Sequence, residues 1–404
     1  MRVANDGQLH LTYCLNVHPG ISWPDVQRNI TEHVLPLKER LSPEAPFGVG
    51  LRLAGEASKE ILAGTELVEF RSFLDEHGLY VYTMNGFPYG PFHGQAVKAN
   101  VHAPDWRDQE RVDYTLRLID ALAVLLPDGI DGGISTNPFG YRPFIDVESD
   151  ATWKLFTERM VAIAFRLHAV SQATGKLIHL DLEPEPDGVL GDCADLIAFY
   201  ETWLLPFGVP RLAERRNLEI DEARSLMLEY IRVCFDTCHV GVGYENPRSV
   251  LARFDALGIK VGKIQVSSAL RLELDSNPEV RAAQAEALAP FDEPVYLHQV
   301  IQQNNDGSIV RYPDLQEALP NIADADAAEW RIHFHVPIFV EHYGAFGSTQ
   351  ETIRETFEVL REDRFTNHLE IETYTWDVLP GDLKLDLDTS IAREYEWVID
   401  VISK

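Results

Sequence analysis

The sequence is poor in cysteine and in basic residues, and it contains no long uninterrupted apolar run. Its 404 residues include only four cysteines, whose spacing fits neither a disulfide framework nor a zinc ribbon. No stretch approaches the roughly 18 consecutive apolar residues of a transmembrane helix, and the N-terminus has no charged and apolar signal segment. We therefore expect a cytoplasmic protein without membrane insertion.

Basic residues are heavily outnumbered by acidic ones. There are 35 Lys and Arg against 64 Asp and Glu, a formal net charge of −29. Nucleic acids and anionic membranes attract basic surfaces, so this charge disfavours both as partners. Hydrophobic residues make up 45% of the chain, which excludes general disorder and suffices for a large core. The length allows one large domain or two medium ones.

What the sequence does contain is a regular alternation of β-prone runs and helical patterns. The runs are 9–18, 47–55, 79–87, 133–137, 176–185, 231–239, 260–268 and 368–376, and the helical ranges between them are 23–41, 57–78, 109–127, 152–175, 196–216 and 247–258. Eight strands alternating with helices predict a (β/α)₈ barrel formed by a single domain, residues 1–404. A doubly wound sheet is the alternative, but no GxGxxG or P-loop follows the first run.

The alternation breaks after the seventh run. Residues 293–312 read as two β-prone runs joined by Asp306-Gly307, and WRIHFHVPIFV (330–340) follows. Asp-Gly between apolar runs is a hairpin signal. We expect an elaborated loop over 270–345, with an inserted hairpin at about 290–340, on the catalytic side of the barrel.

Polar residues gather where the predicted strands end. They are Asn16, His18, Arg52, Asn85, Glu183, Glu185, Asp236, His239, Gln265, Glu370 and Glu372. In a (β/α)₈ barrel these ends surround one pocket. Converging carboxylates and imidazoles are costly to bury unless they are protonated or bind a metal ion. The sequence therefore predicts a divalent cation in the pocket.

The predicted metal ligands are Glu183, Asp236, His239, His333, His335 and Glu372. His333 and His335 share one face of a strand because side chains repeat with period two. Imidazole and carboxylate ligands allow Zn²⁺, Mn²⁺ or Fe²⁺, and an all-oxygen Mg²⁺ site is less favoured if His335 binds. We assign Glu183 or Glu372 as the proton-transfer base and His239 as the residue that orients substrate or carries a proton.

Other strand-end residues are assigned to the substrate. The segment NGFPYGPFHG (85–94) is rich in Gly, Pro and aromatic residues, which suits a rigid loop over a pocket. Either a pocket wall or a purely structural loop fits this composition. The predicted substrate-binding residues are His18, Arg52, Asn85, His93 and Gln265.

These motifs resemble the xylose-isomerase-like TIM-barrel superfamily, which includes sugar isomerases, epimerases and endonuclease IV. More narrowly, LTYCLNVHPG, PFGVGLRL, DLEPEP, FDTCH, KIQVSSAL, HFHVPIF and HLEIETYTWDVLP are similar to the EboE family of metabolite traffic proteins from the ebo gene cluster. The resemblance runs from about residue 9 to residue 380. It implies that Glu183, Asp236 and Glu372 are carboxylate metal ligands, that Gln265 replaces a family histidine, and that His335 supplies the missing imidazole.

Three functions follow from these residues and from the resemblance. The first is a metal-dependent isomerase, epimerase or dehydratase that acts on a small polar metabolite, with a role in processing or trafficking a secondary-metabolite precursor. The second is a carrier that binds a metabolite without catalysis. The third is an endonuclease IV-like phosphodiesterase, which the charge of −29 disfavours. The sequence also allows a homodimer, and the resemblance implies contacts with other ebo-cluster proteins.

Overall fold

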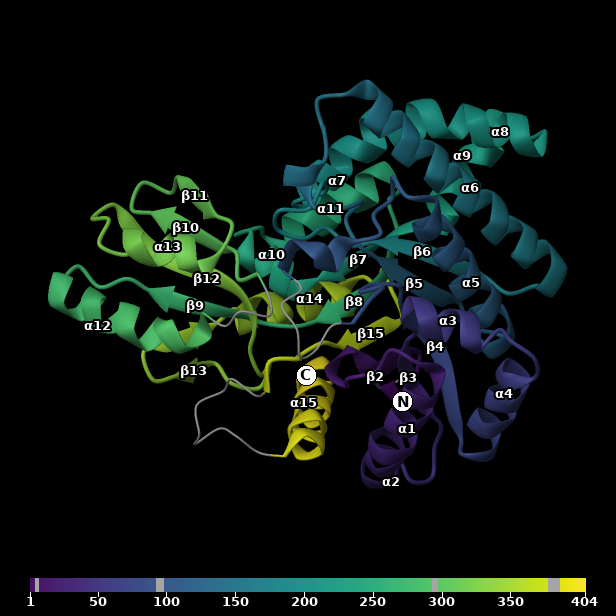
Figure 1. Cartoon of the computed structure of the whole chain (residues 1–404), viewed down its shortest axis with the longest axis horizontal. Coiled ribbons are helices and arrows are strands. Elements are labelled where there is room, and N and C mark those ends of the chain that lie inside the picture. The colour runs from purple at the N-terminus through teal and green to yellow at the C-terminus, as the bar shows by residue number, and fades with distance from the viewer. Residues whose placement is uncertain (4–6, 92–97, 293–296, 377–385) are drawn as a thin grey trace.

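A computed structural model describes residues 1–404 except 4–6, 92–97, 293–296 and 377–385. Its centre is a barrel of eight parallel strands with helices around it (Figure 1). The barrel strands, in sheet order, are β2 (Leu9–Tyr13), β15 (His368–Ile371), β8 (Val261–Val266), β7 (Ile231–Asp236), β6 (Ile178–Leu182), β5 (Gly132–Thr136), β4 (Leu79–Asn85) and β3 (Phe47–Arg52). Each lies in one of the eight predicted runs, apart from Gly132 at the start of β5, and this confirms the predicted barrel.

The barrel closes between β2 and β3 by a narrow seam. A single parallel bridge pairs Cys14 with Gly50, and the Thr12 hydroxyl donates to Gly48 O (2.9 Å) while it accepts from Gly50 N (2.8 Å). A Cβ at Gly50 would lie 2.0 Å from Glu370 Oε1. Glycine therefore makes room for the Glu370 carboxylate inside the barrel.

Helices form the outer layer, and their buried apolar residues join those of the strands in one core cluster. In chain order they are α1 (Trp23–Asn29), α2 (Leu35–Leu41), α3 (Gly55–Glu60), α4 (Glu66–Glu76), α5 (Gln109–Leu125), α6 (Asp150–Thr174), α7 (Cys193–Phe199), α8 (Val209–Arg216), α9 (Ile220–Tyr230), α10 (Thr237–Val242), α11 (Pro247–Leu257), α14 (Gln350–Glu362) and α15 (Leu387–Ile402). Two π-helical segments, Ile30–Val34 and Tyr200–Gly208, join α1 to α2 and α7 to α8. Helices α9, α10, α14 and α15 lie outside the six predicted ranges, and α10 begins within the predicted β-prone run 231–239. In the part of the chain that the structure describes, no helix has the length and apolar character needed to cross a bilayer.

The elaboration after β8 is a second, antiparallel sheet (Figure 1). Its order is β11 (Ile309–Tyr312), β10 (Val300–Asn304), β12 (Ala327–His335), β9 (Ala269–Glu273), β14 (Phe346–Ser348) and β13 (His342–Tyr343), with helices α12 (Pro278–Leu288) and α13 (Leu315–Ala318). The predicted hairpin is β10–β11, with Gly307 at φ 83° in its turn. An apolar cluster that includes Trp330 and Phe334 fills this insert.

The insert reaches the barrel mouth through β12. A β-bulge lies between Ile332 and His335 where β12 pairs with β9. Bulges re-aim side chains next to functional sites. His333 and His335, at the end of β12, line the same cavity as residues at the carboxyl ends of the barrel strands.

Candidate metal centre

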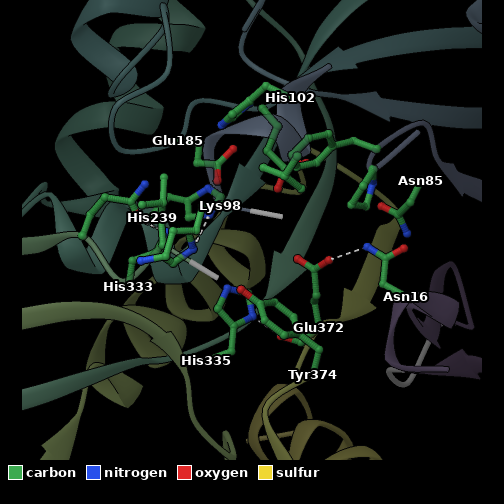
Figure 2. A pocket seen from close by; sticks show the side chains of 16 residues that line it. Asn16, Asn85, Lys98, His102, Glu185, His239, His333, His335, Glu372 and Tyr374 are labelled. Carbon is green, nitrogen blue, oxygen red and sulfur yellow. Dashed lines mark hydrogen bonds between the residues drawn. The ribbon is translucent and has the colours of Figure 1, made fainter. Parts of the chain in front are cut away.

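The carboxyl ends of the barrel strands and the end of β12 enclose one cavity (Figure 2). Its empty volume is about 670 Å³, including the space open to solvent at the mouth. The residues that line it are Asn16, Asn85, Phe87, Pro88, Lys98, Val101, His102, Glu183, Glu185, His239, Leu297, Gln299, His333, His335, Glu372 and Tyr374. The cavity thus contains five of the six predicted metal ligands, and the sixth, Asp236, lies beside it.

One side of the centre consists of carboxylates. Glu183 follows β6, Asp236 ends β7 and Glu372 follows β15, and one oxygen of each lies within 4.8 Å of the others. Asp236 Oδ1 accepts from Cys238 N and Ser267 Oγ, both at 2.6 Å, whereas Oδ2 has no hydrogen-bond partner among the described residues. Asn16 Nδ2 donates to Glu372 Oε1 at 3.0 Å. The protein therefore orients these carboxylates and leaves a buried oxygen of Asp236 available.

Burial and mutual repulsion oppose the ionisation of these groups. Burial, then Glu372 and Asp236, raise the pKa of Glu183 well above its usual range. The pKa of Glu185 rises to about 8, first because it is buried and then because Asp236 and Glu372 are close. Several carboxylates in one dry site ionise together only if positive charge is supplied. A divalent cation meets this requirement.

The other side of the centre consists of three histidines whose Nδ1 atoms are all occupied. His239 Nδ1 donates to Pro184 O (2.8 Å), His335 Nδ1 to Glu372 O (2.6 Å) and His333 Nδ1 to Gln299 Oε1 (2.9 Å). Backbone carbonyls only accept, so the first two tautomers are fixed. Gln299 Nε2 donates to Pro186 O, which turns its Oε1 toward His333. Each Nε2 therefore carries a lone pair, the arrangement typical of metal-ligating histidines.

Two of these lone pairs face each other. The Nε2 atoms of His239 and His333 are 3.2 Å apart, and the imidazoles meet on one side of the cavity (Figure 2). Burial lowers the pKa of His239 and, more strongly, that of His333. Protonation is thus disfavoured as a way to relieve the repulsion, whereas a cation between the two nitrogens relieves it. Asp236, His239 and His335 also place ligand atoms within 4.8 Å of one another, so Asp236 borders both sides.

Beneath the carboxylates lies a buried polar layer around Lys263. Lys263 Nζ donates to Glu370 and, at 2.8 Å, to Asn85 Oδ1. Asn85 Nδ2 donates to Glu370 Oε1 (3.0 Å) and Cys14 Sγ (2.8 Å). Both ends of the Asn85 amide are therefore bound within the protein, although Asn85 lines the cavity. Its assignment to the substrate stays a prediction.

The remaining predicted substrate residues lie elsewhere. His18 stacks on His33 with ring centroids 4.0 Å apart, and Arg52 donates to the carbonyl oxygens of Gly20, Pro88 and Gly90. Neither lines the cavity. Gln265 is fully buried between Asp236 and Glu370 in the strand register, and its amide has no hydrogen-bond partner among the described residues. His93 lies outside the described residues.

Several cavity residues were not among the predicted site residues. They are Lys98, His102, Glu185, Gln299 and Tyr374. Glu185 carried a signal, since it follows Glu183 by two residues in DLEPEP. No local sequence pattern predicts Gln299 as a site residue, because its contact with His333 depends on how β10 and β12 are placed.

Comparison with known proteins finds similar solved structures but no matching family model. A scan against protein-family models and a search of curated proteins find no match, so membership of the EboE family stays a prediction. Similar solved structures include the IOLI protein with a zinc atom (12% identity, 98% of each chain covered, TM-score 0.46). A D-tagatose 3-epimerase-like protein covers 97% of this chain and 98% of its own (12% identity, TM-score 0.47).

A xylose isomerase domain protein from Alicyclobacillus acidocaldarius is also similar (10% identity, 97% of this chain and 98% of that chain covered, TM-score 0.45). The alignment with each of these structures extends over nearly the whole of both chains. At such identities and TM-scores the likeness carries no information on the ion or the substrate of this chain.

Proposed function

We propose that this chain is a divalent-metal-dependent enzyme that isomerises or epimerises a small polar metabolite with neighbouring hydroxyl and carbonyl groups. The observation that carries the proposal is the convergence of three carboxylates with three histidines whose Nε2 lone pairs are fixed by distant carbonyls. Such a donor set fits Zn²⁺ or Mn²⁺ better than Mg²⁺. We place it in the handling of a secondary-metabolite precursor, in line with the resemblance to the EboE family.

The ligands would be Glu183, Asp236 and Glu372 on one side and His239, His333 and His335 on the other. A bound divalent ion supplies a Lewis acid that polarises substrate oxygens. Glu372 is held by Asn16 and faces the cavity, so it is placed to take up or return a carbon-bound proton. Glu185 lines the cavity beside these ligands and is placed to donate a proton to a substrate oxygen. Phe87 and Tyr374 contribute apolar wall, which excludes water from the reacting groups.

The first experiment measures metal content by elemental analysis of the purified chain, alongside Glu183→Gln and His239→Gln. Glu76→Gln, on the exposed face of α4, is the matched control. About one or two equivalents of transition metal in the wild type and in the control, with loss in the site variants, is expected. A wild type that takes up no metal even when soaked with Zn²⁺ or Mn²⁺ refutes a metal-dependent enzyme and leaves a metabolite carrier.

The second experiment tests for catalysis. Hydroxy aldehydes, hydroxy ketones and their sugar relatives are incubated with the protein in D₂O, and deuterium incorporation is followed by NMR. Isomerisation or epimerisation by the proton transfer proposed for Glu372 exchanges a carbon-bound proton, and a chelator should stop the exchange. Metabolite binding in a thermal-shift assay, with neither exchange nor a new isomer in the NMR spectrum, would favour the carrier instead.

A further inference from the structure

A cysteine lies on the imidazole side of the centre. Cys238 is fully buried in the first turn of α10, and ligand atoms of Cys238, His333 and His335 lie within 4.8 Å of one another. We propose that the Cys238 thiolate is a ligand of the ion on this side, together with the two histidines. The proposal rests on the proposed function, since it requires that the centre binds metal, and it names the class of ion that this side selects.

The backbone of Cys238 is held firmly at the end of β7. Its N–H is shared between Asp236 Oδ1 (2.6 Å) and Ser267 Oγ (3.0 Å), and Asp236 Oδ1 also caps His239 N (3.2 Å). These bonds fix the first turn of the helix and hence the direction of the Cys238 side chain. The sulfur thus stays near β12, which carries both histidines.

His335 gives an independent indication of a missing ligand. Its side chain is only 1% exposed, and its Nε2 has no hydrogen-bond partner among the described residues. Its Nδ1 is already used on Glu372 O, so no rotation of the ring satisfies both nitrogens in place. A buried lone pair without a partner is costly. An ion shared by His335, His333 and the sulfur removes this cost.

An ordinary core cysteine would lack these neighbours. Cys238 does pack against the apolar side chains of Val242, Ala269 and Ile301, as a core cysteine would. Of the four cysteines, all of which lie in the described part of the chain, Cys238 is the one grouped with two further ligands. The apolar neighbours exclude water from the sulfur, and the imidazoles complete a coordination set.

The ligand set determines the metal. Thiolate and imidazole are soft or borderline donors, which favour Zn²⁺ and exclude Mg²⁺. The carboxylate side, with Glu183 and Glu372, offers oxygens alone and accepts harder ions. The imidazole side therefore selects a soft or borderline ion such as Zn²⁺ over Mg²⁺.

Zinc-edge X-ray absorption of the zinc-loaded wild type tests this directly. A sulfur shell at about 2.3 Å is expected beside nitrogen and oxygen at about 2.0–2.1 Å. Cys238→Ser should lose the sulfur shell and weaken zinc binding at least about tenfold. Cys234 is a buried cysteine on β7, and Cys234→Ser is the matched control. This variant should keep the sulfur shell and the zinc affinity of the wild type.

Each outcome decides between the proposals. Zinc bound with nitrogen and oxygen neighbours only overturns Cys238 as a ligand but leaves the metal centre intact. A wild type that binds no zinc at all overturns both. If Cys238→Ser does not fold, the zinc-edge spectrum of the wild type still shows whether a sulfur atom binds the zinc. A Co²⁺-loaded wild type adds a second readout, because sulfur-to-cobalt charge transfer in the near ultraviolet appears only if the thiolate binds.

Discussion

Replacement of Lys263 by methionine should destabilise the barrel strongly and in a pH-dependent way. Lys263 and Glu370 form an ion pair in which both side chains are fully buried. Methionine fills a similar volume but leaves the Glu370 carboxylate without its cation. Because Asn85 also donates to Glu370, the geometry of the carboxylate stays defined. The substitution thus removes charge compensation rather than packing.

The expected loss is about 3–5 kcal/mol in the free energy of unfolding, the range for removing one partner of a buried pair. Two unit charges about 4 Å apart at an effective dielectric constant of about 20 interact by about 4 kcal/mol, which agrees. Burial already raises the pKa of Glu370, and Lys263 opposes that rise. In the variant the folded pKa of Glu370 lies higher still, so the folded state binds more protons than the unfolded state. Stability is then retained below the unfolded pKa and lost as the pH rises toward the raised folded pKa.

Urea unfolding at pH 5.5 and pH 8, with a chelator present, measures this loss without a contribution from metal binding. Lys260→Met, which removes an exposed lysine just before the same strand, is the matched control and should cost no more than about 1 kcal/mol. The double variant Lys263→Met/Glu370→Gln should recover part of the loss. The reasoning would be refuted if Lys263→Met were as stable as the control, or if its free energy of unfolding did not differ between pH 5.5 and pH 8.

Three further predictions concern the parts that hold the site. Burial raises the pKa of Glu394 to about 8, so wild-type stability should fall as the pH rises from about 4.5 to 8. Glu394→Gln should flatten this slope in thermal unfolding, and equal slopes would contradict it. Arg281 donates to the carbonyl oxygens of Asp275, Ile322, Asp324 and Ala327. Arg281→Met should lower the free energy of unfolding by about 1–3 kcal/mol and make the insert more susceptible to proteolysis. An unchanged rate of cleavage would show that the Arg281 hydrogen bonds do not hold the insert together. A Cβ at Gly262 would lie 1.9 Å from Asp181 Oδ1, whereas Gly90 has open space. Gly262→Ala should lower Tm, at a cost of about 1–3 kcal/mol, and Gly90→Ala should not.

The strands and the carboxylates were readable from the sequence because their signals are local. Each barrel strand is a short β-prone run, and Glu183, Asp236 and Glu372 stand where such runs end. The parallel arrangement brings strand ends together, so position along the chain was enough to group these carboxylates. Asp306-Gly307 likewise identified the β10–β11 hairpin from two adjacent residues.

Tertiary structure determines which ring nitrogen of each site histidine carries the proton, and how the barrel closes. The Nδ1 partners of His239, His333 and His335 are 55, 34 and 37 residues away. No local pattern encodes contacts at such separations. For the same reason the sequence placed His18 at a strand end, but only packing showed that it stacks on His33 instead of lining the cavity. Periodicity fixes which face a side chain occupies, whereas its hydrogen-bond partner depends on how separate elements meet.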